Sequence, residues 1–257
     1  MKKDTRNILI AVAVTAAVFA AAYSALIVYS GSFSPFYTVE SGSMRHSGDS
    51  QIGVIDAGDM MLVRDPSVKT VVSYIEGRET EYMMFGDCGD VIVYERPGRT
   101  PVIHRVILFI EYNGNGTWNA PALAAYTGAW SCTGGTDAGS LSGVLRFDGL
   151  GWNGASFDVD LNALRTDVPS GYITKGDANP GADQSAANIS LNMLVGKDRV
   201  IAVAANEVPW LGCIKLLFTD SEGSIPPNSI VCLVLFFTAV TALIAASCIL
   251  YDRLKKR

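Results

Sequence analysis

The sequence predicts a mainly β domain carried by two membrane-spanning helices, and three observations support this prediction. Residues 8–29 and 230–251 contain no Asp, Glu, Lys or Arg, and each span is 22 residues long. About 20 apolar residues are enough for a helix to cross the hydrocarbon core of a bilayer. Between the spans lie short β-branched runs separated by Gly, Pro, Asn and Asp, which is the pattern of strands and turns.

The first apolar span is interpreted as a retained anchor, because the core of a cleaved signal peptide is only roughly 7–15 residues long. The charged residues before residues 8–29 sum to +2, and residues 252–257 sum to +3. Short positive flanks remain in the cytoplasm. We therefore expect a cell-membrane protein with two spans, residues 1–7 and 252–257 in the cytoplasm, and residues 30–229 outside.

Net charge and composition exclude several classes of protein. The whole chain carries −5, and the two positive ends contribute +5, which leaves −10 for residues 30–229. This balance excludes a strongly basic nucleic-acid binder. Hydrophobic residues make up 49% of the chain, which excludes an intrinsically disordered protein.

Cysteine and histidine usage gives no sign of a metal site. Cys88, Cys132 and Cys213 lie outside the apolar spans, without CxxC spacing, so one disulfide is compatible with the sequence but its pairing is not determined. His46 and His104 are the only histidines, and a Cys/His zinc site is therefore not expected. We expect no metal and no cofactor.

The middle of the chain contains six short runs that predict strands, and no long amphipathic helix. The runs are Met60–Val63, Val91–Tyr94, Val102–Ile110, Tyr172–Thr174, Leu194–Gly196 and Val200–Ala204. Residues 111–170 differ from their surroundings, because they hold 10 of the 25 glycines and three of the four tryptophans. A structureless loop of this length is rare in a compact domain, so we expect hairpins with some internal strand structure there.

One set of residues supplies the hydroxyl, imidazole and carboxylate side chains that serine catalysis requires. Ser43 lies on a glycine-containing turn shortly after the first span. A serine is a weak nucleophile until a positioned base takes its proton. Histidine side chains, with a reference pKa of about 6.5, suit that role, and the chain offers His104. Asp177 and Asp183, on a turn-rich stretch, could each supply the carboxylate that orients such a base.

Five ordered motifs resemble the conserved boxes of type I signal peptidases. They are Ser41–Met44, Gly58-Asp59, Gly89–Tyr94, Ile103–Val106 and Thr174–Asn179. A histidine in place of the lysine of the bacterial class indicates the archaeal and endoplasmic-reticulum class. The match covers residues 39–110 and 172–183 and continues weakly to residue 212. Residues 66–86 and 111–170 do not match and are expected to be insertions.

The resemblance implies a role for each matching residue and a mainly β, signal-peptidase-like fold. It makes Ser43 the nucleophile and His104 the general base. Ser41, with the backbone N–H of Ser43, would help to hold the oxyanion. Asp183 would be the third member of the triad, and Asp177 a supporting or alternative acid.

The chain departs from the family pattern just after the nucleophile. The family usually has an acidic residue and a proline soon after the methionine, whereas Arg45 and His46 follow Met44 here. This puts the local turn in question, and it makes His46, three residues from Ser43, a rival base. A Ser-Lys mechanism is less favoured, because Lys69 lies in sequence that does not match the family.

The implied function is that of a membrane-bound serine endopeptidase that removes signal peptides. Its partners would be secretory preproteins with small residues at positions −1 and −3, the lipid bilayer and the translocation machinery, but no nucleic acid. One alternative is a non-catalytic β-rich surface or adhesion module, which the glycine-rich and tryptophan-rich segment and two glycosylation sequons, at Asn115 and Asn188, would suit. Another alternative is a peptidase of the same fold that cleaves only a narrow set of substrate proteins.

Overall fold

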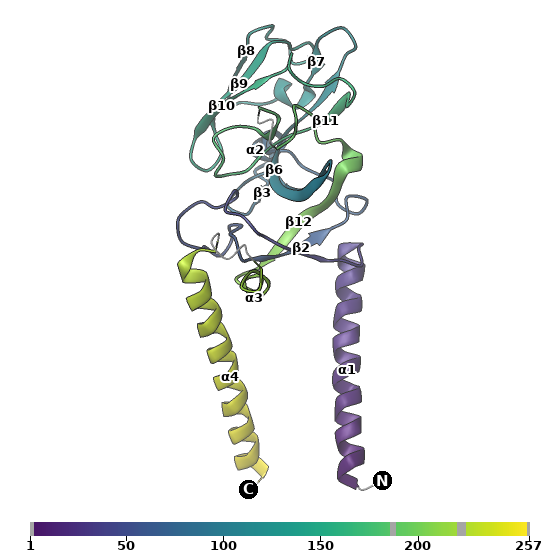
Figure 1. Cartoon of the computed structure of the whole chain (residues 1–257), viewed down its shortest axis with the longest axis vertical. Helices are drawn as coiled ribbons and strands as arrows, with labels where there is room; N and C mark the ends of the chain where they lie inside the picture. Colours follow the sequence, from purple (N-terminus) through teal and green to yellow (C-terminus); the bar gives the residue numbers. More distant parts are fainter. Residues whose placement is uncertain (1–2, 186–188, 220–224, 256–257) are drawn as a thin grey trace.

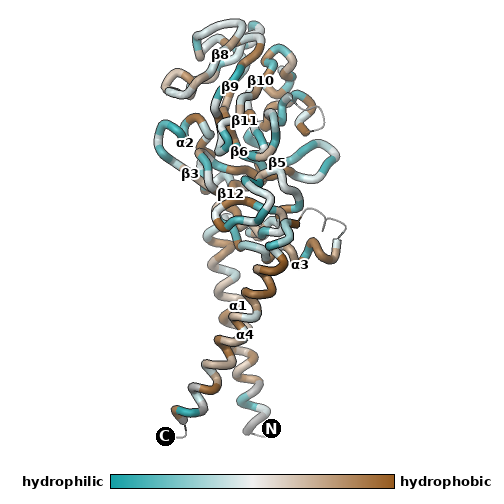
Figure 2. Tube along the Cα trace, turned by 90° about the vertical axis from the view of Figure 1, so that its left-hand side faces the viewer, coloured by the Kyte–Doolittle hydropathy of each residue, from teal (hydrophilic) through white to brown (hydrophobic). Residues whose placement is uncertain are grey.

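Two long apolar helices extend from the same side of the β domain, and both termini lie at the same end of the molecule (Figure 1). In the computed structural model, which describes residues 3–185, 189–219 and 225–255, these helices are α1 (Lys3–Ser30) and α4 (Pro227–Lys255). Both are long and apolar enough to cross a membrane, and hydrophobic residues predominate along them (Figure 2). The prediction of two apolar helices is confirmed, although each helix extends beyond the uncharged span at both ends.

Some predicted features lie outside the described residues. They are Asn188 of the second sequon, and residues 1–2 and 256–257 of the two predicted cytoplasmic ends.

Proline at the start of α4 fits the first helical position, where a backbone N–H would have no partner within the helix.

A seven-stranded antiparallel sheet extends from the part of the β domain nearest the helices, where β2 and β12 lie, toward the opposite end, where β7 lies (Figure 1). Its strands are β1 (Phe36–Thr38), β2 (Met60–Arg64), β5 (Val91–Arg96), β6 (Arg99–Tyr112), β7 (Trp118–Asn119), β11 (Ser170–Lys175) and β12 (Val200–Val208). The order is β1-β2-β12-β5-β6-β11, and β7 pairs with the end of β6. Five of the six predicted runs lie within these strands. The sixth, Leu194–Gly196, makes only an isolated bridge to β11, because the chain turns at once into the 3-10 helix η3 (Lys197–Arg199).

Residues 111–170 contain a second antiparallel sheet, so the internal strand structure expected there is present. Its strands are β8 (Ala129–Cys132), β9 (Val144–Leu150) and β10 (Ala155–Asp160), in the order β10-β9-β8, and a 3-10 helix, η1 (Pro121–Ala124), precedes them. This sheet lies at the end of the molecule farthest from the two apolar helices (Figure 1). Phe147 and Phe157 share one buried cluster with Ile107 and Ile110 of β6. The segment is therefore packed onto the main sheet.

The unmatched residues 66–86 include the short helix α2 (Tyr74–Thr80) and lead into the small hairpin of β3 (Met83–Met84) and β4 (Asp87–Cys88). A capping box begins α2, in which Ser73 and Glu76 bond each other's backbone N–H groups. Between α1 and α4, the described residues form two α-helices, which are α2 and the short α3 (Cys213–Leu216).

The loop between β1 and β2 carries Ser43, and buried carboxylates fix its far end. Asp59 accepts hydrogen bonds from the backbone N–H groups of Trp210 at 2.9 Å and of Asp56 at 2.8 Å. The Asp56 carboxylate in turn accepts from the N–H of Gln51 at 2.7 Å. Glu207 of β12 accepts from the N–H of Gly53. These bonds hold the loop against β12 and the segment that leads to α3.

We expect the Glu207→Gln variant to be more stable than the wild type at pH 8 and equally stable near pH 4. Burial above all, with repulsion from Asp59 and Asp56, raises the pKa of Glu207 from 4.5 to about 7. The folded state therefore binds more protons than the unfolded state between those two pKa values, and the stability of the wild type falls as the pH rises through that range. The variant loses the part of this dependence that Glu207 contributes, while the part contributed by Asp59, whose pKa burial raises to about 6, remains. Melting temperatures measured from pH 4 to pH 8 test the prediction.

The matched control is Glu81→Gln, because Glu81 is an exposed glutamate. This control is expected to follow the wild-type melting temperatures across the whole pH range. A Glu207→Gln variant with the wild-type pH dependence would contradict the assignment.

Candidate active site

Ser43, His104 and Asp183 form one chain of hydrogen bonds. The Nε2 atom of His104 lies 3.0 Å from the Ser43 Oγ, and its Nδ1 atom lies 2.7 Å from an Asp183 carboxylate oxygen. A carboxylate only accepts hydrogen bonds, so Nδ1 carries the ring hydrogen and Nε2 is free to accept from the serine hydroxyl. The imidazole is therefore oriented to take a proton from Ser43.

Three separate elements bring these side chains together. His104 lies on β6 opposite Ile92 of β5. Asp183 begins the 3-10 helix η2 (Asp183–Ser185), and the next residue, Gln184, accepts a hydrogen bond at 3.0 Å from the backbone N–H of Thr174 in β11. Ser43 lies in the loop after β1. The site is thus supported by the central strands, while the nucleophile comes from the loop that follows β1 in sequence.

The carboxylate of Asp183 is completely buried and accepts two further hydrogen bonds. The hydroxyl groups of Tyr94 at 2.8 Å and Thr174 at 2.7 Å donate to the same oxygen that His104 contacts. Burial, and after it the charge of Asp183, raises the pKa of Tyr94 well above its usual range, so its hydroxyl stays a donor at neutral pH. These bonds hold the carboxylate in the orientation that His104 requires.

The second candidate acid, Asp177, has different partners. Arg105 donates to both of its oxygens, at 2.9 and 2.7 Å, and His46 donates to one of them at 2.9 Å. Burial alone would raise the pKa of Asp177, but the charge of Arg105 and the hydrogen bonds from His46 and Arg105 hold it below its usual range. The structure therefore pairs His46 with Asp177, and His104 with both Ser43 and Asp183.

The remaining predicted residues also have definite positions. The Ser41 Oγ lies 3.3 Å from the Ser43 Oγ, so its hydroxyl is beside the candidate nucleophile. Because the Ser43 hydroxyl donates to His104, Ser41 acts as the donor in this contact. Lys69 forms an ion pair with Asp90 at 3.2 Å and donates a hydrogen bond to the Tyr82 hydroxyl at 3.2 Å. These contacts of Lys69 involve neither Ser43 nor His104.

Gly176 brings the turn after β11 against the candidate nucleophile and base. A Cβ atom at this position would lie 2.7 Å from the Ser43 carbonyl oxygen and 2.9 Å from His104 Nε2. Neighbouring Lys175 donates to the carbonyl oxygens of residues 176 and 177, at 3.1 and 3.3 Å. The turn can approach this closely only because residue 176 has no side chain.

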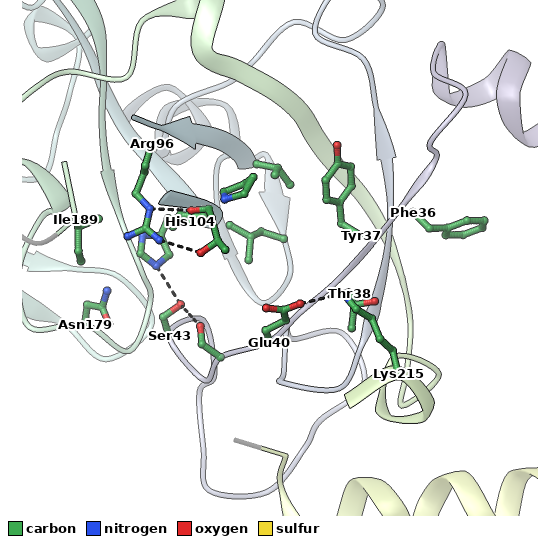
Figure 3. A pocket seen from close by; sticks show the side chains of 16 residues that line it. Phe36, Tyr37, Thr38, Glu40, Ser43, Arg96, His104, Asn179, Ile189 and Lys215 are labelled. Atoms are coloured by element: carbon green, nitrogen blue, oxygen red, sulfur yellow. Dashed lines mark hydrogen bonds and ion pairs between the residues drawn. The ribbon is translucent and has the colours of Figure 1, made fainter. Parts of the chain in front are cut away.

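Ser43 and His104 open into a pocket of about 670 Å³. Figure 3 shows the two side chains pointing toward one another, with Asn179 beside them. Farther along the wall, Glu40 and Lys215 of α3 form an ion pair at 2.9 Å. Phe36 and Tyr37 of β1 line the same pocket, so it reaches toward the end of α1.

Within the described ranges, no group of three His, Cys, Asp or Glu side chains could hold a metal ion. All five cysteines are in the described part of the chain and are unpaired, so the structure contains no disulfide between Cys88, Cys132 and Cys213.

Sequence reasoning missed the residues that support the two aspartates. Tyr94, Thr174 and Arg105 stand inside the quoted motifs, but their roles depend on strand pairing. Ile92 and Tyr94 alternate onto one face of β5, and Ile92 pairs with His104. The alternation along residues 91–94 can be read from the sequence, but the pairing that places Tyr94 near the histidine comes only from the structure.

The chain was also compared with known proteins. No family model and no curated protein matches this chain.

Proposed function

We propose that this chain is a membrane-anchored serine endopeptidase that removes signal peptides from secretory preproteins. The observation that carries the proposal is the hydrogen-bonded series Ser43–His104–Asp183 at the wall of an open pocket. The ordered motifs that resemble type I signal peptidases of the archaeal and endoplasmic-reticulum class support the same function and a signal-peptidase-like fold.

The proposed reaction uses each group where it lies. Ser43 attacks the carbonyl carbon of the scissile peptide bond while His104 Nε2 takes its proton. His104 then donates this proton to the leaving amine, and a water molecule, activated by the same imidazole, hydrolyses the acyl-enzyme. Asp183 keeps the ring in the correct tautomer and stabilises the imidazolium that forms.

The oxyanion requires donors that point at the developing charge. The Ser41 hydroxyl and the Ser43 backbone N–H are the proposed pair, because Ser41 Oγ lies next to the nucleophile. Removing one such donor costs about 3–4 kcal/mol of transition-state stabilisation in enzymes of this chemistry. Ser41 is exposed on the pocket wall and is therefore accessible to a substrate carbonyl.

The two apolar helices favour a substrate held in the same membrane. The Ser43 loop starts just after β1, close in sequence to the end of α1, and Lys215 of α3 contributes to the pocket wall. In the proposed arrangement both termini are cytoplasmic and the β domain lies outside. The end of a signal peptide anchored in the bilayer would then lie near Ser43 at a high effective concentration.

A cleavage assay in membranes tests the proposal. Membranes containing the full chain are incubated with a labelled secretory preprotein, and the cut is mapped by mass spectrometry. One cut after small residues at −1 and −3 is expected. If the wild type makes no site-specific cut in a panel of preproteins, the non-catalytic surface module becomes the better reading. If it cuts only a few surface proteins, the protein is a peptidase with a narrow client set.

A Gly176→Ala variant is expected to fold but to cleave about 100-fold more slowly, because a displacement of about 1 Å at a reacting group can have this cost. The added Cβ would overlap the Ser43 carbonyl and His104 Nε2, at 2.7 and 2.9 Å. Gly181→Ala is the matched control in the same connection, because a Cβ there meets no atom within 4 Å. The measurement is kcat for each variant, together with its melting temperature. Equal kcat values for the two variants would contradict the proposed geometry.

A further inference from the structure

The turn after β11 holds the nucleophile loop through its backbone. The N–H of Ala178 donates to the Ser43 carbonyl oxygen at 2.9 Å. The preceding residue, Asp177, is the anchor of this turn, because its carboxylate binds Arg105 through two N–H groups and His46 through Nε2. The placement of Ser43 therefore depends on Asp177, and the placement of Asp177 depends partly on His46.

His46 is itself held in place by a flat aromatic surface. Its ring stacks on the indole of Trp152, with ring centroids 4.7 Å apart and planes inclined by 14°. Gly86 lies against the same imidazole, and a Cβ there would come within 3.1 Å of its Cε1 atom. As a result only 9% of the His46 side chain is exposed, although it belongs to a surface loop.

Trp152 belongs to the 111–170 segment, at the turn that joins β9 to β10. The turn is docked on the main domain, because the N–H of Gly151 donates to the hydroxyl of Tyr74 at 3.1 Å, and Tyr74 is buried in α2. Trp152 remains 43% exposed, and the ring that it stacks on is that of His46. A large aromatic residue at a hairpin tip thus contacts the loop of the candidate nucleophile.

We infer that Trp152 and His46 are positioning residues of the peptidase, through which the 111–170 segment holds the Ser43 loop at hydrogen-bond distance from His104. The inference rests on the proposed function. Without the indole, His46 can rotate away from Asp177, and the turn that bonds the Ser43 carbonyl loses one of its supports. This loss alters the alignment of reacting groups and leaves the substrate-binding walls of the pocket in place.

The test compares kcat and KM for one preprotein, using the full chain in membranes. Trp152→Ala is expected to lower kcat about tenfold, which corresponds to the free energy of a stacked aromatic pair. It is expected to change KM less than about twofold. Trp152→Phe retains a ring for stacking and should restore most of kcat. His46→Gln keeps a donor for Asp177 but loses the stack, so it should resemble Trp152→Ala. The double variant should be no slower than the slower single variant, because both residues act through one contact.

Asp158→Ala is the matched control on the same hairpin, because Asp158 forms an exposed ion pair with Arg146 that contributes little to stability. It should match the wild type in kcat and KM. Wild-type kcat in both Trp152→Ala and His46→Gln would overturn the inference, as would additive losses in the double variant or no rescue by phenylalanine. If Trp152→Ala does not accumulate, His46→Gln decides the question. A wild type that cuts no preprotein would instead overturn the proposed function, so the two failures are distinguishable.

Discussion

Membranes containing the Ser43→Ala variant are expected to leave a labelled preprotein uncut, while wild-type membranes cut it at one site. The substitution removes the oxygen that lies 3.0 Å from His104 Nε2 and would form the acyl bond. Loss of the nucleophile in a serine protease lowers kcat by a factor on the order of 10⁶. The measurement is the rate of appearance of the cleaved product, with the cut site mapped for the wild type.

Two serines of the same loop serve as controls for Ser43→Ala. Ser41→Ala should reduce the rate by about 10²–10³, because it removes one proposed oxyanion donor and leaves the nucleophile in place. Ser47→Ala should retain the wild-type rate, because the Ser47 side chain bonds only the backbone of Asp49 in the described part of the chain. Full activity in Ser43→Ala would reject the mechanism.

The Asp183→Asn variant is expected to lower kcat by about 10²–10⁴-fold, the range that general acid–base catalysis contributes. The hydroxyl groups of Tyr94 and Thr174 donate to the carboxylate oxygen that faces His104 Nδ1, so an asparagine would direct its carbonyl oxygen there. The neutral amide could still accept from Nδ1, but it would carry no negative charge to stabilise the imidazolium that forms when His104 takes the proton of Ser43. The measurement is kcat across a pH series.

Asp177→Asn is the matched comparison, and it should impair cleavage less than Asp183→Asn. Asp177 contacts Arg105 and His46, whereas the acid that contacts His104 is Asp183. The principal effect of Asp177→Asn should be on stability, because breaking a buried ion pair costs about 3–5 kcal/mol. Its melting temperature should therefore fall more than that of Asp183→Asn. The reverse ranking of the two kcat values would make Asp177 the catalytic acid.

Much of the fold was predictable because its signals are local. The two apolar helices follow from uncharged spans of membrane length, and strands β2, β5, β6, β11 and β12 follow from short β-branched runs between turn residues. The three strands of the second sheet were not predicted individually. They lie in a stretch whose connections are rich in glycine and turn residues, and what makes them strands is burial against β6, as the shared cluster around Phe147 shows.

The candidate site was predictable as a set of residue types and motifs, but not as a geometry. Ser43 and His104 are 61 residues apart, and His104 and Asp183 are 79 residues apart. The sequence left two acids and two histidines open as candidates. Strand pairing and the docking of η2 on β11 bring Asp183 to His104. Asp177 lies instead against His46.

By itself, therefore, the sequence determined the class of fold, the two apolar helices and the residues around which a serine mechanism could be built. Hydropathy, strand propensity and motif order are local properties of the chain, and they can be read without coordinates. Only the tertiary structure decided which acid meets which histidine, how Tyr94 and Thr174 orient Asp183, and that Trp152 of the 111–170 segment contacts the Ser43 loop. These relations depend on distances of about 3–5 Å between residues remote in sequence, and only the packed sheet brings such residues together.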